Sequence, residues 1–323
     1  GLVTPLCAGQ VISNDRYQVQ VTVGGAAAIG LVGDPRTVFV DPRLLVQRRG
    51  TDPGLATIAD DFAEINYRLN SWVDAGGVRT PDVFDAEPPA VATASVFDTD
   101  ASGVTWTMSG TNGLDATVRL SVPPGHGMPI LDIHLTATSA GWFGVTFAGI
   151  EDTATSSIDE VWQPMVWSER RLPDRSYLTL AYRCPLPMSA VRRADGLTFG
   201  VTAGAGELPF QPLPTSENSR FGVLLRDEAG LLRPMIAPVA FGASGSYMSS
   251  GEQRSFRSRV LVEDGRPDEA AERVARELFG FGDSRENLWR STNETIDNIV
   301  AYALGAFGGW DAGLKAQSFR QDF

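Results

Sequence analysis

Residues 103–122 read GVTWTMSGTNGLDATVRLSV, and this stretch sets the pattern for most of the chain. Two runs that alternate apolar and polar residues flank the tripeptide Thr111-Asn112-Gly113. Alternation with a period of two is typical of a strand that buries one face. Asn and Gly tolerate the positive φ that a tight hairpin turn requires. We therefore predict an antiparallel β-hairpin across residues 103–122.

The same pattern of short alternating runs and turns extends from about residue 10 to residue 262. Residues 16–23, RYQVQVTV, alternate in this way before Gly24-Gly25, and residues 37–47, TVFVDPRLLVQ, place two strands around Asp41-Pro42. Runs of this kind are typical of antiparallel sheets with one buried face. No helical pattern alternates with the strands, which argues against βαβ units. We expect a large antiparallel β-sandwich.

The hydrophobic period changes at residues 265–282, GRPDEAAERVARELFGFG. Pro267 suits the first position of a helix, and Gly280 can end it in the left-handed conformation. Glu269 with Arg273, and Glu272 with Arg276, are spaced for i,i+4 ion pairs. This pattern predicts a helix between Pro267 and Gly280.

A second, longer helix is predicted from about residue 284 to residue 307. Its apolar residues fall on one stripe: Leu288, Ile296, Ile299, Val300, Ala303, Leu304 and Phe307. About 22 residues at 1.5 Å per residue would span about 33 Å. An apolar stripe of this kind needs another apolar surface to pack against. The preceding sheet can supply only part of that surface.

The order of these elements resembles a family of carbohydrate-active enzymes, the glycoside hydrolases and phosphorylases that join an N-terminal galactose-mutarotase-like β-supersandwich to a six-hairpin α/α toroid. Residues 1–265 would be the supersandwich, 266–282 the linker helix, and 283–323 the first helix and tail of the toroid. The expected fold class is mainly β, a large antiparallel β-supersandwich followed by C-terminal α-helices. Two helices cannot close six hairpins, so we expect that Phe323 is not the natural C-terminus.

The resemblance implies that this region binds carbohydrate and has no catalytic activity by itself, because the catalytic carboxylates of the family lie mainly in the toroid. Its apolar helix would pack on a missing C-terminal α/α domain or on a second copy through residues 284–307. One alternative is a self-contained carbohydrate-binding or interaction protein whose helices pack on its own sheet. A complete epimerase or lyase of sandwich type is the third and weakest hypothesis.

Two stretches carry the candidate sugar-binding residues. Sugar rings stack on aromatic side chains, while carboxylates and guanidinium groups bind their hydroxyls. The candidates are Trp162, Trp167, Glu169 and Arg170 in residues 160–184, and Trp310 with Asp311 in the turn predicted at residues 307–313. The competing interpretation is that the tryptophans cover a sheet edge or anchor a helix end.

His126 and His134 are the two histidines of the chain. His134 is predicted on the strand face opposite Leu131, Ile133 and Leu135, and His126 in a loop. Mutarotases use histidines with a glutamate for acid/base ring opening, but no mutarotase motif surrounds either residue here. We expect ordinary surface or hydrogen-bonded histidines.

Composition excludes several classes of partner. The net charge of −12 argues against nucleic acid, which requires clustered positive charge. No run of 18 apolar residues occurs, so no membrane insertion is expected. No nucleotide, cofactor or metal-ligand motif is found, and we expect no cofactor and no metal. The near absence of lysine, with Lys315 alone, suggests a GC-rich bacterial genome. A cytoplasmic and a secreted location both remain open.

Overall fold

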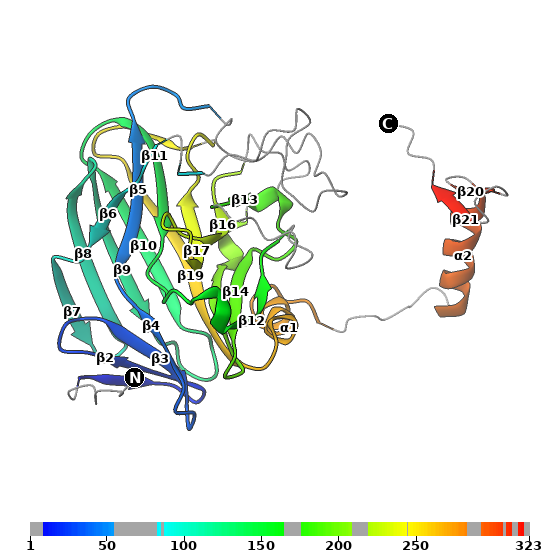
Figure 1. Cartoon of the computed structure of the whole chain (residues 1–323), viewed down its shortest axis with the longest axis horizontal. Coiled ribbons are helices and arrows are strands. Elements are labelled where there is room, and N and C mark those ends of the chain that lie inside the picture. The colour runs from blue at the N-terminus through cyan, green and yellow to red at the C-terminus, as the bar shows by residue number, and fades with distance from the viewer. Residues whose placement is uncertain are drawn as a thin grey trace. The chain divides into compact units, whose positions relative to one another are not determined.

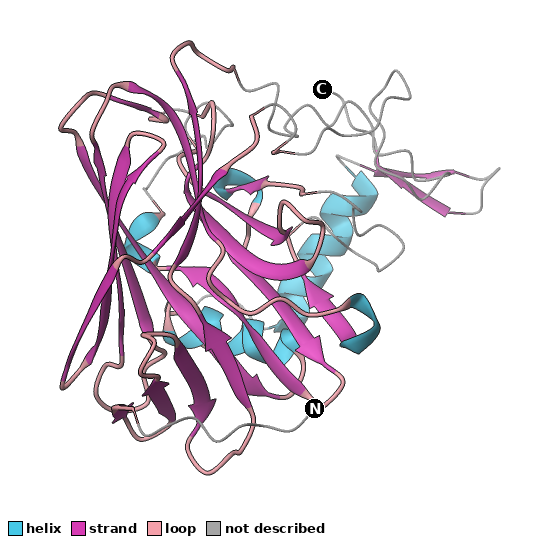
Figure 2. Cartoon of the chain, turned by 60° about the vertical axis from the view of Figure 1, so that its left-hand side comes forward, coloured by secondary structure: helices cyan, strands magenta, loops and turns pink. Residues whose placement is uncertain are grey.

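The computed structural model describes residues 9–54, 83–84, 87–164, 176–208, 219–243, 245–282, 292–305, 308–311 and 316–319. The chain forms two compact units, Gly1–Gly280 and Phe281–Phe323. Each is described by itself. More of the described residues lie in strands than in helices (Figure 2). The mainly β fold expected from the sequence is confirmed.

The larger sheet of the first unit has eight antiparallel strands in the order β12-β14-β15-β19-β10-β9-β8-β7 (Figure 1). Its strands are β7 (Val96–Asp100), β8 (Gly103–Thr111), β9 (Leu114–Ser121), β10 (Ile130–Ala137), β12 (Ile158–Trp162), β14 (Met188–Arg193), β15 (Leu197–Ala203) and β19 (Gln253–Asp264). Burial alternates along β9 and β10, as expected of a sheet with one face on the core.

A second sheet has seven strands, six of them in the order β13-β16-β17-β11-β5-β6, and β18 pairs with β11. These strands are β5 (Arg43–Arg49), β6 (Ala90–Thr93), β11 (Gly141–Phe147), β13 (Thr179–Leu180), β16 (Gly222–Arg226), β17 (Leu232–Val239) and β18 (Tyr247–Met248). A third sheet contains β1 (Val11–Ser13), β2 (Tyr17–Val21), β3 (Ala27–Leu31) and β4 (Thr37–Val40). Short 3₁₀ turns occur at η2 (Thr155–Ser157), η4 (Ala181–Arg183) and η5 (Ala205–Glu207).

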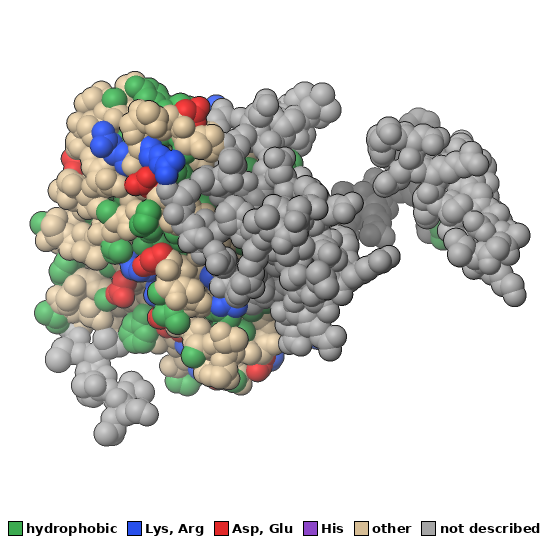
Figure 3. Space-filling view, turned by 45° about the horizontal axis from the view of Figure 1, so that its top comes forward, with side chains coloured by type: hydrophobic (Ala, Val, Ile, Leu, Met, Phe, Trp, Pro, Cys, Tyr) green, Lys and Arg blue, Asp and Glu red, His purple; other side chains and the backbone are tan. Residues whose placement is uncertain are grey.

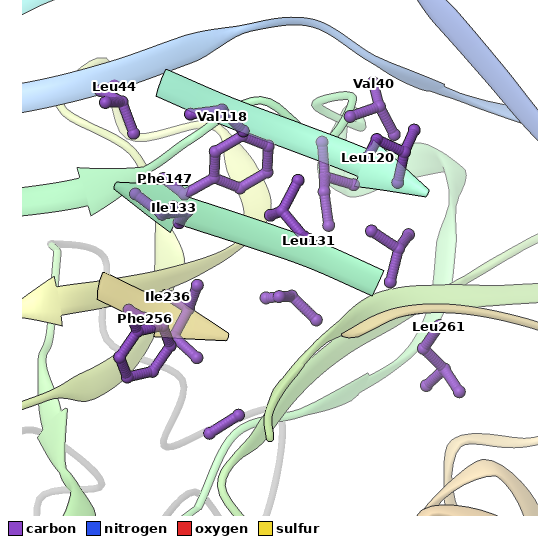
Figure 4. Close-up of a cluster of buried hydrophobic side chains, with 14 of the residues drawn as sticks. Val40, Leu44, Val118, Leu120, Leu131, Ile133, Phe147, Ile236, Phe256 and Leu261 are labelled. Carbon is purple, nitrogen blue, oxygen red and sulfur yellow. The ribbon is translucent and has the colours of Figure 1, made fainter. Parts of the chain in front are cut away.

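The main core lies between the eight-stranded and seven-stranded sheets. Figure 4 shows part of it, where Leu131 and Ile133 of β10 lie among side chains such as Phe147 of β11 and Ile236 of β17. A second cluster, which includes Leu45, Leu224 and Met235, forms another buried apolar group. The seven-stranded sheet supplies both clusters, so its strands β16 and β17 are buried almost continuously and do not alternate.

The Asn112-Gly113 turn predicted from the sequence is confirmed. Asn112 has a φ of 53° and Gly113 a φ of 81°, and Thr111 pairs with Leu114 across the turn. Two successive positive φ values match the twist of the flanking strands. A register shift between Met108 and Thr111 separates this turn from the regular pairing of β8 with β9.

The helix predicted after the last long strand is α1 (Pro267–Glu277), and Gly280 has a φ of 70° as expected. The Glu272–Arg276 ion pair is present, at 2.9 Å. The predicted Glu269–Arg273 pair was wrong. The Glu269 carboxylate instead accepts a bond from the backbone N–H of Arg266, at 3.0 Å, because the N-terminal amides of a helix lack partners.

Helix α1 packs against the eight-stranded sheet beside β12, β14 and β15 (Figure 1). Its residues Ala270, Ala271 and Val274 are buried in the main core cluster. The helix lies in the same compact unit as the sandwich. The segment that the sequence suggested as a linker therefore contributes apolar surface to the core.

The second unit contains helix α2 (Thr292–Gly305) and a hairpin of β20 (Gly308–Asp311) and β21 (Ala316–Phe319). Residues 284–291 and 306–307 of the predicted helix lie outside the described residues. The prediction of a Gly-rich turn at Trp310 and Asp311 was wrong, since both lie in β20. Residues 316–319 supply the backbone partners of this strand, and four residues without clear alternation gave no sign of that pairing.

Within the described part of the chain, no helix has both the length and the apolar character that crossing a membrane requires.

Substituting Gly200 by alanine tests how closely the eight-stranded sheet packs. A Cβ at Gly200 in β15 would lie 2.2 Å from the backbone oxygen of Ser189 in β14. We expect a loss of about 2 kcal/mol of unfolding free energy, because the backbone must shift to admit the methyl group. The control is Gly50→Ala, where a Cβ meets nothing within 4 Å. Urea denaturation measures both, and equal stabilities would contradict the packing described here.

Candidate functional site

Two pockets of about 490 Å³ each lie where β10 ends and β19 begins. The inner pocket is lined by Leu135, Gly206, Glu207, Arg220, Phe221, Pro238, Val239, Gly245, Glu252, Gln253, Arg254, Ser255 and Phe256. The outer pocket is lined by Asp132, His134, Gly204, Ala205, Gly206, Glu207, Ser255, Phe256, Arg257, Arg259 and Leu278. This volume falls in the range of small-molecule sites.

β10 and β19 supply side chains to both pockets. Leu135 is buried toward the core and helps to form the inner pocket. His134 and Arg257 are exposed and line the outer pocket. Ser255 and Phe256, which are neighbours in β19, line both pockets.

The inner pocket has an apolar floor. Phe221 and Phe256 pack edge to face, with ring centroids 5.2 Å apart and an interplanar angle of 60°. They are 2% and 6% exposed, and Leu135 and Val239 are also buried. The aromatic pair contributes stability beyond its buried area. These four side chains belong to the apolar part of the lining of the inner pocket, which can receive the C–H face of a ligand.

Charged side chains line the inner pocket beside this floor. Arg254 forms an ion pair with Glu252 at 2.8 Å, and its guanidinium also donates to the carbonyl oxygen of Tyr247 at 2.7 Å. Glu252 accepts a bond from the backbone N–H of Ser249, at 2.9 Å. That bond and the Arg254 guanidinium hold the pKa of the Glu252 carboxyl below its usual value. Arg220 is exposed and makes no ion pair within the described chain.

The outer pocket contains a bidentate ion pair and a hydrogen-bonded histidine. Arg257 holds Asp132 through bonds of 2.6 and 3.1 Å, and these raise the pKa of the guanidinium. His134 Nδ1 lies 2.8 Å from Ser255 Oγ. The expectation that His134 is a hydrogen-bonded surface residue opposite Leu131 and Ile133 is confirmed. Its place in a pocket was not expected.

Glu207, in η5, lines both pockets. Its Oε1 accepts a bond from the backbone N–H of Arg257, at 2.7 Å. Burial raises the pKa of the Glu207 carboxyl, and the bond from Arg257 opposes this shift only in part. A half-buried carboxylate at the junction of two pockets is a strong acceptor for a hydroxyl group.

Among the described residues that line the two pockets, none was predicted from the sequence as a site residue. Trp162 lies in β12, the edge strand of the eight-stranded sheet, where it is partly buried against the main core. Its buried Nε1 has no hydrogen-bond partner. This position fits the interpretation that Trp162 covers a sheet edge.

The other predicted site residues cannot be placed relative to the pockets. Trp167, Glu169 and Arg170 lie outside the described residues. Trp310 and Asp311 belong to β20, and their side chains are also outside the described part. Their proposed contacts with sugar stay predictions.

The described residues that line the pockets come from seven separate parts of the chain. These are β10, η5 with Gly204 before it, the two residues before β16, the end of β17, Gly245, β19 with Glu252 before it, and Leu278 after α1. No motif links them, because each part is an ordinary strand or turn. Among the described residues, no group of three or more His, Cys, Asp or Glu side chains could hold a metal ion.

No protein-family model matches this chain, and no curated protein matches it. An α-mannosidase from Enterococcus faecalis V583 is 9% identical, with a TM-score of 0.41 over 82% of this chain and 30% of the mannosidase. A putative aldose 1-epimerase from Escherichia coli K12 is 11% identical, with a TM-score of 0.36 over 78% of this chain and 98% of the epimerase.

A heparan sulfate lyase mutant from Pedobacter heparinus is 11% identical, with a TM-score of 0.30 over 81% of this chain and 37% of the lyase. The chain thus spans about a third of the length of the mannosidase and of the lyase. These similarities are weak. The fold described above follows from the strand pairing of this chain itself.

Proposed function

We propose that this chain is the N-terminal β-sandwich region of a glycoside hydrolase-like protein, and that it binds carbohydrate without being catalytic by itself. The inner pocket is the binding site in this proposal. The observation that carries it is the apolar floor of Phe221 and Phe256 beside the charged side chains of Arg220, Arg254 and Glu252.

This combination suits the chemistry of a sugar. A pyranose ring has an apolar C–H face and a rim of hydroxyl groups that donate and accept hydrogen bonds. The floor can bury the C–H face, while carboxylates accept from hydroxyls and guanidinium groups donate to them. Solved structures similar to this chain are named as carbohydrate-active proteins, but at their low TM-scores the proposal is carried by the pocket instead.

A self-contained carbohydrate-binding protein is the alternative. The observation that favours it is that all residues lining the two pockets lie between Asp132 and Leu278, inside the first compact unit. In this alternative the site needs no residue from the second unit. The proposal and the alternative agree on the ligand and on the pocket.

Residues 283–323 are proposed as the opening of a helical α/α domain. Ile296, Ile299 and Val300 of α2 are 51%, 62% and 48% exposed, and these apolar side chains support the need for a partner. Further helices of such a domain, or a second copy of the helix, would supply that partner.

Substituting Arg220 by alanine tests the site. Titration calorimetry with D-glucose, D-galactose and D-mannose should find binding, and Arg220→Ala should weaken it about tenfold, because a charged hydrogen bond contributes about 1.5 kcal/mol or more. The control is Arg276→Ala, an exposed arginine on α1 that lines neither pocket. Equal affinities in the wild type and Arg220→Ala would remove the inner pocket from the proposal.

A further inference from the structure

The inner and outer pockets are contiguous. They share four lining residues, Gly206, Glu207, Ser255 and Phe256. Gly206 and Glu207 belong to η5, and Ser255 and Phe256 are neighbours in β19. Glu207 therefore lies at the boundary of the two pockets.

The two pockets together have a nearly balanced charge. Four arginines, Arg220, Arg254, Arg257 and Arg259, lie beside three carboxylates, Asp132, Glu207 and Glu252. Two of these arginines already form ion pairs with two of the carboxylates. Basic and acidic side chains also lie next to each other on the face drawn in Figure 3.

A third arginine donates a hydrogen bond to a backbone carbonyl group. Arg259 donates to the carbonyl oxygen of Met128 at 3.1 Å, and burial lowers the pKa of its guanidinium. Arg220 and Arg259 make no ion pair within the described chain, and of these two only Arg220 is exposed. Uronic acids and sulfated sugars require unpaired cations to replace the water around their charges. The chain also carries a net charge of −12, which repels such ligands at long range.

We propose that the two pockets are adjacent subsites of one groove that binds a neutral oligosaccharide of at least two sugar units. This inference rests on the proposed carbohydrate function. One ring packs on the Phe221–Phe256 floor of the inner pocket. The next ring lies in the outer pocket against His134 and Arg257, and Glu207 accepts hydrogen bonds from hydroxyls at the junction.

Binding in the outer subsite should increase the affinity for a disaccharide by a measurable factor. Titration calorimetry compares D-glucose with cellobiose and maltose, D-galactose with lactose, and D-mannose with mannobiose. At least one of these disaccharides should bind tenfold or more tightly than its monosaccharide. In His134→Ala this ratio should fall to about one, because His134 lines only the outer pocket.

His126→Ala is the matched control, since His126 lines neither pocket, and circular dichroism checks that both variants fold. Digalacturonate tests the ligand class. If it binds more tightly than the neutral disaccharides, the proposal of a neutral ligand is overturned. Monosaccharide binding with no disaccharide increment, or an increment that survives His134→Ala, would overturn the second subsite and leave the proposed function standing. No binding of any of these sugars would overturn both.

Discussion

Replacing Glu263 by alanine is expected to lower the free energy of unfolding by about 3 kcal/mol, because it removes a carboxylate that binds two arginines and leaves the buried Tyr17 hydroxyl without its acceptor. Glu263 in β19 is 7% exposed. Its carboxylate pairs with Arg273 of α1 at 3.1 Å and with Arg16, and it accepts a bond from the hydroxyl of Tyr17 at 3.0 Å. Tyr17 is fully buried in β2.

This cluster connects three parts of the first unit: the four-stranded sheet, the eight-stranded sheet and α1. The guanidinium groups of Arg16 and Arg273 each lie 5.9 Å from the centre of the Tyr17 ring. Burial, and then the Glu263 carboxylate, raise the pKa of the Tyr17 hydroxyl. Removal of Glu263 therefore disturbs every contact in the cluster at once.

Glu277→Ala is the matched control, because Glu277 also pairs with Arg273, at 3.0 Å, but is 44% exposed. An exposed ion pair contributes at most about 1 kcal/mol. Urea denaturation, analysed with one common m-value for the variants, gives both losses of unfolding free energy. If the two variants lose the same stability, the burial of the Glu263 cluster does not control the energy of these contacts.

Trp106→Ala is expected to cost about 4 kcal/mol, the usual range for deleting a fully buried aromatic side chain. Trp106 in β8 is 0% exposed, and its Nε1 donates to the carbonyl oxygen of Gly25 at 2.7 Å. The substitution leaves a large cavity and an unpaired carbonyl between β8 and the turn that joins β2 to β3. Thermal or urea unfolding of the intact chain measures the loss.

Trp142→Ala serves as its control. Trp142 in β11 is only partly buried, and its main aromatic contact is an edge contact with Tyr247, with ring centroids 5.6 Å apart. Its deletion should cost about 1 kcal/mol. A loss at Trp106 no larger than the loss at Trp142 would show that β8 does not anchor the four-stranded sheet.

Much of the secondary structure could be predicted from the sequence because its causes are local. The Asn112-Gly113 turn, the alternation of β9 and β10, and the Pro267 and Gly280 ends of α1 each depend on residues a few positions apart. The prediction was wrong at two places where a different local interaction decides the conformation. Glu269 bonds to the helix N-terminus, and β20 forms because β21 pairs with it.

The candidate site could not be predicted in the same way. The sequence analysis favoured tryptophans with nearby charges, and Trp162 proved to lie on an edge strand. The pockets use Phe221, Phe256 and Glu207 instead, and such residues are common in any β protein. Nothing near them in the sequence distinguishes a core phenylalanine that also lines a pocket from a core phenylalanine that does not.

The sequence alone determined three features: the antiparallel strands with their alternating pattern, the buried face of β10, and the two ends of α1. Only the tertiary structure decided that β10 and β15 both pair with β19. That pairing brings His134, Glu207 and Arg257 together, although at least 50 residues separate each of them from the next in the sequence. The physical reason is that a period of two specifies which face of a strand is apolar, whereas the choice of neighbouring strand depends on packing across the whole core.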